Sequence, residues 1–111
     1  MGQRIVREGG TIARMTYRVR ARLWLYPGAA GWHFLTLPRD VAEHVEAEAG
    51  PRHGFGSVRV AATIGETTWN TSIFPDRESE SFLLPVKRQV RAAEGVVDGD
   101  TIEVELDLED R

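Results

Sequence analysis

The sequence predicts a mainly β domain, a small and mostly antiparallel barrel of six strands with two short helices. Apolar and polar side chains alternate along several short segments, which is typical of strands that bury one face. Clusters of turn-forming residues separate these segments, and the expected strands come in hairpins rather than as parallel strands joined throughout by helices. A barrel follows because closure pairs the edges of short-stranded β domains.

Length and composition exclude several classes of protein. The chain has 111 residues, which indicates a single domain. It contains no cysteine, so disulfide scaffolds, cysteine-based zinc fingers and thiol catalysis are excluded. No apolar run reaches the roughly 18 residues of a transmembrane helix, and the N-terminus lacks the apolar segment of a signal peptide. We therefore expect a globular, cytoplasmic protein that does not associate with membranes.

The first residues do not follow the pattern of the rest. Residues 1–14 combine three arginines with Gly2, Gly9 and Gly10 and show no regular period. We interpret them as a flexible N-terminal leader, from an upstream start or an added extension, and residues 15–111 as the single barrel domain. Whether the leader belongs to the folded unit is left open.

The first hairpin is expected over residues 17–37, around a turn rich in Pro, Gly and Ala. This turn pairs Tyr26 with Trp32. Two residues further along each strand, Trp24 then lies opposite Phe34. One face of the hairpin therefore carries four aromatic side chains.

A short helix is expected after this hairpin. Asp40 is the predicted N-terminal cap, and Glu43 follows at the spacing of a capping box. Val41 and Val45 form the apolar stripe of the helix. Gly50, with the proline after it, ends the helix.

A second hairpin is expected over residues 57–74, with Gly65 as the first residue of a two-residue loop. This loop pairs Ala62 with Trp69. Because side chains alternate across a strand, Trp69 and Ile73 then both point inward.

The last expected elements are a short strand at residues 81–84, a short helix from Pro85 to Glu94, and a final strand at residues 101–108. Proline suits the first position of a helix, and Gly95 is a typical C-terminal stop. The count of six strands and two helices is then complete.

Charge is unevenly distributed along the chain. Residues 1–22 carry six Arg and one Glu, whereas residues 94–111 carry eight acidic residues and one Arg. One interpretation is a basic arm for nucleic acid with an acidic tail. We favour the other, in which two strands from the chain ends lie side by side and their charges offset. The alternating charged residues are Arg18, Arg20 and Arg22 on one strand and Glu103, Glu105 and Asp107 on the other.

No motif in the sequence indicates catalysis or a metal. His33, His44 and His53 do not have the spacing of a zinc site. The carboxylates around Gly99 do not have the spacing of a calcium loop, and aspartates in turns usually bind their own backbone. We therefore assign no catalytic residue, no metal and no cofactor, and an enzyme is the weakest of the functional interpretations.

The sharpest candidate site is a pair of cations on the second expected helix. Lys87 and Arg91 are four residues apart, so they share a helix face. Lys87 is expected in the first turn, where the helix dipole favours anions. The two cations suit a phosphate or a carboxylate, with Ser72 as an additional hydrogen-bond donor. We favour a carboxylate of the protein itself as their partner, with Glu103 or Glu105 as the candidates.

The second candidate site joins the aromatic face of the first hairpin to the arginines beside it. Bases stack on aromatic rings while arginines track phosphates, so this arrangement suits single-stranded nucleic acid. The residues concerned are Arg18, Arg20, Arg22, Trp24 and Trp32. The alternative, which we favour, is that a helix covers the aromatic face and makes it part of the core.

Three strings in the chain resemble a known bacterial family. They are W-H-F-L-T-L-P at residues 32–38, W-N-T-S-I-F-P at residues 69–75, and L-P-V-K at residues 84–87, which leads through Arg91 to the Gly-Asp at residues 99–100. Together they are similar to the family catalogued as domain of unknown function nineteen-zero-five, over about residues 17–108. Some members of that family are fused to a YdeI/OmpD-associated domain.

The resemblance implies a double-split β-barrel, an architecture shared with swapped-hairpin transcription factors. The family has no established activity, so it supplies no catalytic residues. The positions that match its strings are Trp32, Pro38, Trp69, Ser72, Pro75, Lys87 and Arg91. Function does not transfer through fold alone. Our first functional hypothesis is therefore a non-enzymatic binding module for a small anionic ligand, and the alternative is a nucleic-acid-binding regulator, in either case a monomer or a homodimer.

Overall fold

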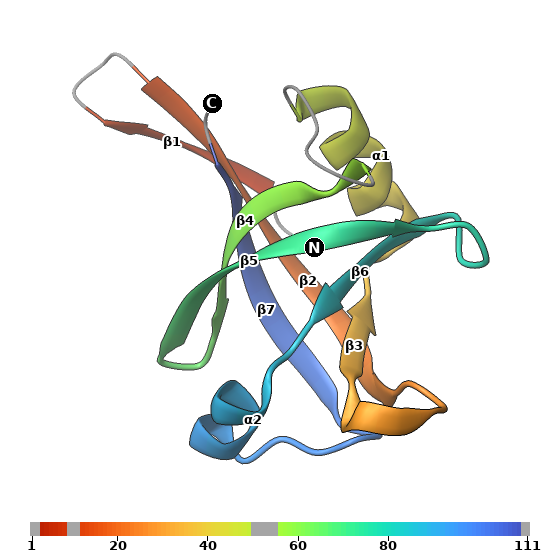
Figure 1. The fold of residues 1–111 in the computed structure, drawn as a ribbon. Helices are drawn as coiled ribbons and strands as arrows, with labels where there is room; N and C mark the ends of the chain where they lie inside the picture. The colour runs from red at the N-terminus through yellow and green to blue at the C-terminus, as the bar shows by residue number, and fades with distance from the viewer. Residues whose placement is uncertain (1–2, 9–11, 50–55, 110–111) are drawn as a thin grey trace.

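The computed structural model describes residues 3–8, 12–49 and 56–109, and six of its strands close into an antiparallel barrel (Figure 1). The order around the barrel is β2-β3-β6-β5-β4-β7, and pairing of β2 with β7 closes it. The barrel strands are β2 (Ile12–Leu25), β3 (His33–Thr36), β4 (Val58–Ile64), β5 (Thr67–Asp76), β6 (Ser81–Pro85) and β7 (Thr101–Leu108). The prediction of a mainly β, double-split barrel with six strands and two helices is confirmed.

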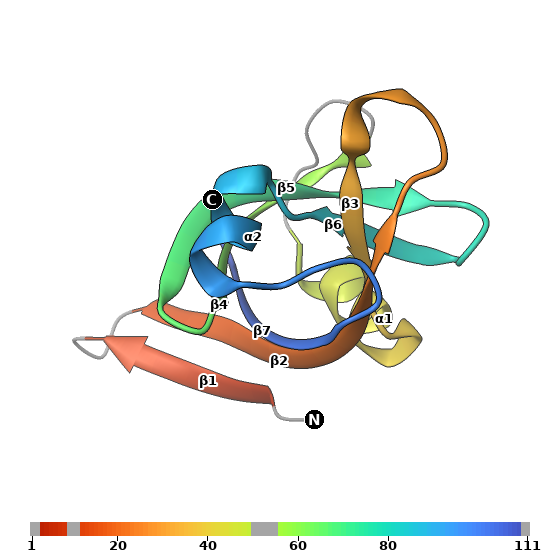
Figure 2. The same ribbon diagram turned by 90° about the horizontal axis from the view of Figure 1, so that it is seen from below.

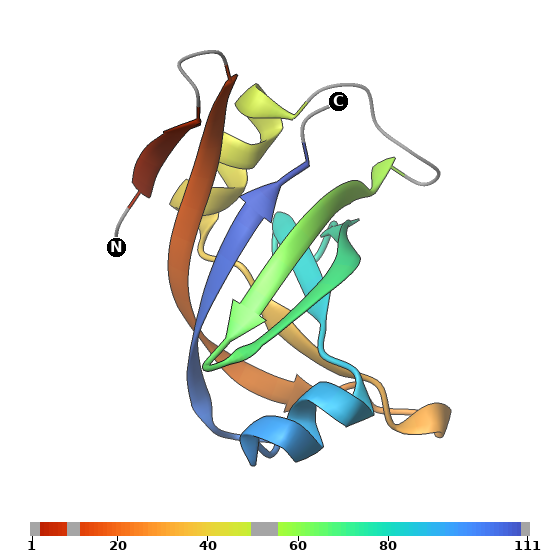
Figure 3. The same ribbon diagram turned by 90° about the vertical axis from the view of Figure 1, so that its left-hand side faces the viewer.

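Strand β2 closes the barrel because it changes partners along its length. Residues 16–22 pair with β7, and residues 23–25 pair with β3. The strand therefore curves from one half of the barrel into the other (Figure 3). Its inward positions Tyr17, Val19 and Leu23 are all buried.

A further strand, β1 (Gln3–Glu8), lies at the end of the strand order and pairs antiparallel with the first part of β2. Figure 2 shows it running along the outside of β2. The sequence pattern predicts a leader over residues 1–14 and the first barrel strand from residue 17. In the structure, β2 begins at Ile12. A strand outside the closed ring has no barrel interior to fill, so its residues need not alternate in the way that marks the other strands.

The interior of the barrel is filled by the inward faces of its strands. Both predicted hairpin registers are confirmed, with Trp24 opposite Phe34 and Ala62 opposite Trp69. Alternation places Leu25 on the same face of β2 as Leu23, but Leu25 is 46% exposed because it is the last residue of the strand. The largest fully buried side chains are Tyr17, Leu23, Leu35, Leu37, Ile73, Leu84 and Leu106.

The two α-helices lie at opposite ends of the barrel (Figures 1 and 3). Helix α1 (Arg39–Glu48) packs Val41, Ala42 and Val45 into the core. The prediction that Asp40 caps this helix from outside is wrong. Pro38 occupies the capping position, and Asp40 lies in the first turn, where its Oδ1 accepts a hydrogen bond from the amide of Val41 at 2.8 Å. No helix in the described part of the chain has the length and apolar character needed to cross a membrane.

Helix α2 (Arg88–Glu94) is shorter than predicted. Pro85 is the last residue of β6 rather than the start of the helix, and Lys87 precedes the helix with an extended backbone. The reason is that the ladder to β3 continues, since the amide of Val86 donates to the carbonyl of His33 at 3.0 Å. Gly95 ends the helix in the left-handed conformation, as predicted.

Candidate functional site

The segregated charges are explained by the pairing of β2 with β7. Arg18 lies opposite Glu105, and Arg20 lies opposite Glu103. The Nη2 atom of Arg18 is 2.8 Å from the Oε2 atom of Glu105. This hydrogen bond, with the negative charge of Glu105, raises the pKa of Arg18. The prediction that strands from the two chain ends lie side by side is confirmed.

These arginines and the aromatic side chains occupy different parts of β2. Arg18, Arg20 and Arg22 lie on the part that pairs with β7, whereas Trp24 lies on the part that pairs with β3. The nucleic-acid hypothesis needs both groups at one surface. Two of its three arginines are opposite carboxylates instead.

The aromatic face itself is exposed. The expectation that a helix covers it and makes it core is wrong, because Trp32 is 52% exposed and Tyr26 is 49% exposed. Both α-helices lie at the ends of the barrel (Figure 1), whereas these two residues belong to the connection between β2 and β3. The aromatic side chains therefore form a surface that the core does not use.

The rings on this surface hold one another in place. Trp32 stacks on Phe34 with ring centroids 5.8 Å apart and planes 13° apart. Trp24 contacts the same phenyl ring at 5.4 Å, and its Nε1 donates a hydrogen bond to the Oγ1 of Thr36 at 2.9 Å. Tyr26 meets Phe34 edge to face at 6.1 Å. The surface is thus a packed set of rings rather than a collection of loose side chains.

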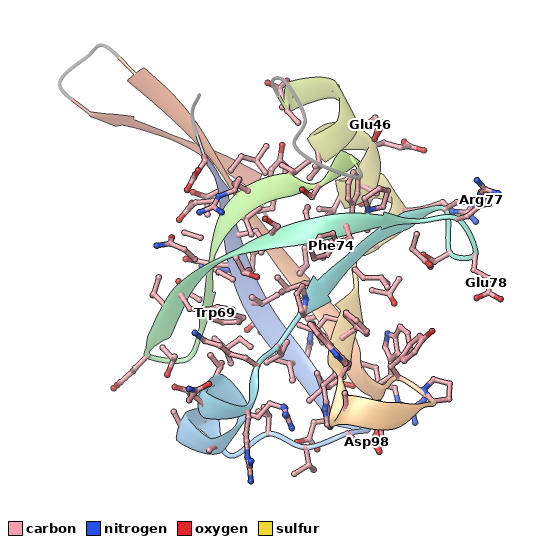
Figure 4. All side chains as sticks on the ribbon, viewed as in Figure 1. Glu46, Trp69, Phe74, Arg77, Glu78 and Asp98 are labelled. Atoms are coloured by element: carbon pink, nitrogen blue, oxygen red, sulfur yellow. The ribbon has the colours of Figure 1, made fainter. Side chains whose placement is uncertain are left out.

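A cavity of about 290 Å³ opens on this surface, and we call it the aromatic groove. Phe74 of β5 and Leu83 of β6 complete it, and they lie opposite each other in the strand ladder. Figure 4 shows Phe74 on β5. Its lining residues are Tyr26, Trp32, Phe34, Phe74 and Leu83. Sequence reasoning missed Phe74 and Leu83, although an apolar residue at an outward strand position is the signal that identifies them.

A second cavity, of about 530 Å³, carries the positive charge, and we call it the cationic pocket. Lys87, Arg88 and Arg91 line it from α2 and the residue before the helix. The opposite wall of the pocket is formed by the turn before β3 and by the first residue of that strand. The remaining lining residues are Ala30, Gly31, Trp32, His33, Pro85 and Val86.

The backbone around the cationic pocket orients two of its side chains. The Nε of Arg91 donates to the carbonyl of Val86 at 3.1 Å. The Nδ1 of His33 lies 2.8 Å from the carbonyl oxygen of Gly31. The guanidinium of Arg91 is therefore held by one edge, and its two terminal nitrogens have no hydrogen-bond partner among the residues that the structure describes.

The protein's own carboxylates do not neutralise this pocket within the described residues. No carboxylate of residues 16–49 or 56–109, whose side chains the structure describes, lies within 4.0 Å of Lys87, Arg88 or Arg91. The expectation that Glu103 or Glu105 is their partner is wrong, because these glutamates lie opposite arginines of β2. The cations therefore converge without an internal counter-charge in the described part of the chain.

The predicted ligand residues are only partly brought together. Lys87 and Arg91 both line the cationic pocket, although Lys87 does so from outside the helix. Ser72 lies on β5 opposite Arg59 and lines neither cavity. Arg88 was missed, although it stands three residues before Arg91, a spacing that also places two side chains next to each other on a helix face.

No metal centre is found among the described residues. Within them no three His, Asp or Glu side chains converge as metal ligands. The Oδ2 of Asp100 accepts a hydrogen bond from the amide of Val97 at 2.9 Å, as expected for a turn aspartate. His53 lies outside the described residues.

Comparison with known proteins identifies the family. A family model described as Domain of unknown function (DUF1905) matches residues 20–106. The match covers both α-helices, β3 to β6 and parts of β2 and β7, and it includes every residue that lines the two cavities. A search of curated proteins found no match. Because the matched residues make up most of the chain, the protein belongs to the family described as Domain of unknown function (DUF1905).

Proposed function

We propose that this barrel is a non-enzymatic binding module that takes a small anionic ligand in the cationic pocket. The observation that carries the proposal is the convergence of Lys87, Arg88 and Arg91 on one cavity without a carboxylate partner among the described residues. Like charges gathered at one place repel one another, and a bound anion offsets this repulsion.

The chemistry of the three cations supports a phosphate or a carboxylate as the bound group. The guanidinium of Arg91, held through its Nε, presents terminal nitrogens in the fork that pairs with two anionic oxygens at once. Lys87, which directly precedes α2, adds the point charge of a flexible ammonium group to the same pocket. The whole chain carries a formal charge of −3, so the pocket is a local positive region on an acidic protein.

The proposal is tested by thermal unfolding at low salt with pyrophosphate, ribose 5-phosphate and citrate as probes. A ligand at 100 times its Kd stabilises the fold by about 2.7 kcal/mol, which raises the Tm on the order of ten degrees for a domain of this size. We expect a rise in Tm with at least one probe. The double variant Lys87→Gln/Arg91→Gln should fold normally and lose that rise.

The matched control removes the same charge elsewhere. Arg20 and Arg77 are exposed and line neither the cationic pocket nor the aromatic groove. The variant Arg20→Gln/Arg77→Gln should therefore keep the full ligand response. An equal loss in both double variants would show non-specific attraction and contradict the proposal. If the pocket variant unfolds without ligand, the two cations are structural and the proposal is wrong.

Single-stranded nucleic acid is the second candidate. The exposed set of stacked rings favours it, since bases stack on such surfaces. The pairing of Arg18 with Glu105 weighs against it, because that arginine is engaged in an ion pair. Binding of a short oligonucleotide should be steep in salt, and a flat anisotropy signal at low salt would dispose of this candidate.

A further inference from the structure

We infer that the ligand carries a planar aromatic ring beside its anionic group, and that the ring stacks on Trp32 while the anion binds Lys87 and Arg91. The inference rests on the proposed function and specifies the class of its ligand. A nucleoside 5′-phosphate belongs to this class, with the base as the ring.

Trp32 is the residue that joins the two cavities. It lines the cationic pocket together with Lys87 and Arg91, and it also lines the aromatic groove together with Tyr26 and Phe34. A ligand that occupies the cationic pocket therefore lies against the indole. Any extension of that ligand past Trp32 enters the aromatic groove.

The indole of Trp32 is already oriented before a ligand binds. One neighbour, Phe34, stacks on it with planes 13° apart, and Trp24 and Tyr26 pack against that phenyl ring in turn. Trp24 is itself tied to Thr36 by its hydrogen bond of 2.9 Å. Binding therefore costs little side-chain entropy at Trp32. Because Trp32 is 52% exposed, area remains on it for a second ring to stack.

The two cavities sort the two ends of such a ligand. The aromatic groove is lined by three aromatic residues from the first hairpin together with Phe74 and Leu83, and none of its lining side chains is charged. A phosphate gains nothing there, whereas a flat ring buries apolar area. The cationic pocket has the reverse preference. The cavities, about 530 and 290 Å³, match the size of small-molecule sites.

The test compares three probes on the full chain by calorimetric titration: adenosine 5′-monophosphate, ribose 5-phosphate and adenosine. Base stacking on an aromatic side chain strengthens binding by roughly ten- to a hundredfold. We expect the nucleotide to bind more tightly than ribose 5-phosphate by about this factor. The variant Trp32→Ala should lower the affinity for the nucleotide by about this factor and lower the affinity for ribose 5-phosphate much less, because only the nucleotide has a ring to stack on the indole.

Two further variants keep the result specific. Trp32→Phe retains a ring and should recover most of the lost nucleotide affinity, which a merely structural role of the indole would not predict. Leu25 is exposed to a similar extent and lines neither cavity, so Leu25→Ala should leave both affinities unchanged. The variant Lys87→Gln/Arg91→Gln should lower the affinities for the nucleotide and for ribose 5-phosphate by the same factor.

The outcomes separate the inference from the proposed function. The nucleotide and ribose 5-phosphate could bind with equal affinity, and both could lose binding in the Lys87→Gln/Arg91→Gln variant. This result would overturn the inference that a ring stacks on Trp32 and would leave the anion site supported. No binding of either phosphate would overturn both. Binding of an oligonucleotide without binding of the mononucleotide would overturn the inference and support the second candidate.

Discussion

Arg18 and Glu105 are joined by a hydrogen bond of 2.8 Å across β2 and β7, although 87 positions separate them in the chain. The pair lies in the ladder that closes the barrel, next to Arg20 opposite Glu103. The basic start and the acidic end of the chain are therefore a means of aligning two strands. Lys87, Arg88 and Arg91 have no such carboxylate partner among the residues whose side chains the structure describes.

Reversing one charge of this pair should destabilise the barrel, and reversing both should restore it. Glu105→Arg places two arginines opposite each other across the strands, where like charges repel. We expect a lower Tm for this variant, a recovery in Arg18→Glu/Glu105→Arg, and a smaller difference at high salt. Thermal unfolding at two salt concentrations measures both effects. A double variant as unstable as the single one would show that the pairing contributes nothing.

Tyr17→Phe should stabilise the protein. The side chain is 1% exposed, and its hydroxyl has no hydrogen-bond partner among the described residues. An unsatisfied buried polar group costs about 1–3 kcal/mol, which phenylalanine avoids while it keeps the ring. We expect the free energy of unfolding in urea to rise by about 1 kcal/mol. A loss of stability would mean that the hydroxyl has a partner.

The same residue should make stability fall at alkaline pH. Burial, followed by the negative charge of Glu48, raises the pKa of Tyr17 in the folded protein above its ordinary value of 10.0. As the pH rises past 10.0, the unfolded chain loses this proton while the folded chain keeps it, so the folded state loses relative stability. Below that pH the contribution is fully present. Urea unfolding at pH 8 and pH 11 should therefore show the advantage of Tyr17→Phe growing with pH, and equal advantages at both values would contradict this.

Gly65→Ala should destabilise the barrel more than Gly95→Ala. Both glycines have positive φ, of 57° and 66°, where an L-residue pays roughly 1–2 kcal/mol. At Gly65 a β-carbon also meets the carboxylate of Glu94, which accepts a hydrogen bond from Thr67 at 2.5 Å. Nothing lies within 4 Å of a β-carbon at Gly95. Denaturant unfolding of the two variants isolates this extra contact, and equal losses would show that Glu94 moves aside freely.

Leu35→Ala should cost about 2–5 kcal/mol. The side chain is fully buried, and it lies on β3, which joins β2 to β6. Its truncation leaves a cavity in the core of the barrel. Leu25→Ala is the control, since that side chain is exposed and should change the free energy of unfolding by about 0.5 kcal/mol or less. Similar losses in the two variants would contradict the assigned faces of these strands.

Local pattern was sufficient for much of the fold. The register of the second hairpin follows from Gly65, because a two-residue loop leaves a single pairing for Ala62 and Trp69. The charged face of β2 and its partner on β7 were also predictable, since alternation and opposite charge both act between neighbouring strands. By contrast, the predicted start of α2 at Pro85 was wrong, since the helix begins at Arg88. Proline permits a helix to begin, but the backbone hydrogen bond from Val86 to His33 keeps this segment extended.

The candidate site was predictable only in part. Lys87 and Arg91 were identified from their spacing, and Arg88 was missed although it stands three residues before Arg91 and lines the same pocket. Ser72 was chosen from a matching string and lies elsewhere, on β5 opposite Arg59. Spacing within one element is a local property, whereas the meeting of α2 with the turn before β3 depends on the path of the whole chain.

The sequence by itself determined the barrel class, the hairpin registers and the pairing of the chain ends, because each depends on alternation, turn length or charge between neighbouring strands. Only the tertiary structure decided that the aromatic face is exposed and that Trp32 lies between a groove and a pocket. The strand pattern gives Trp24 and Trp32 a common face, but it cannot say whether a helix covers that face. Both α-helices lie at the ends of the barrel instead (Figure 1), and Tyr26 and Trp32 are left exposed to solvent.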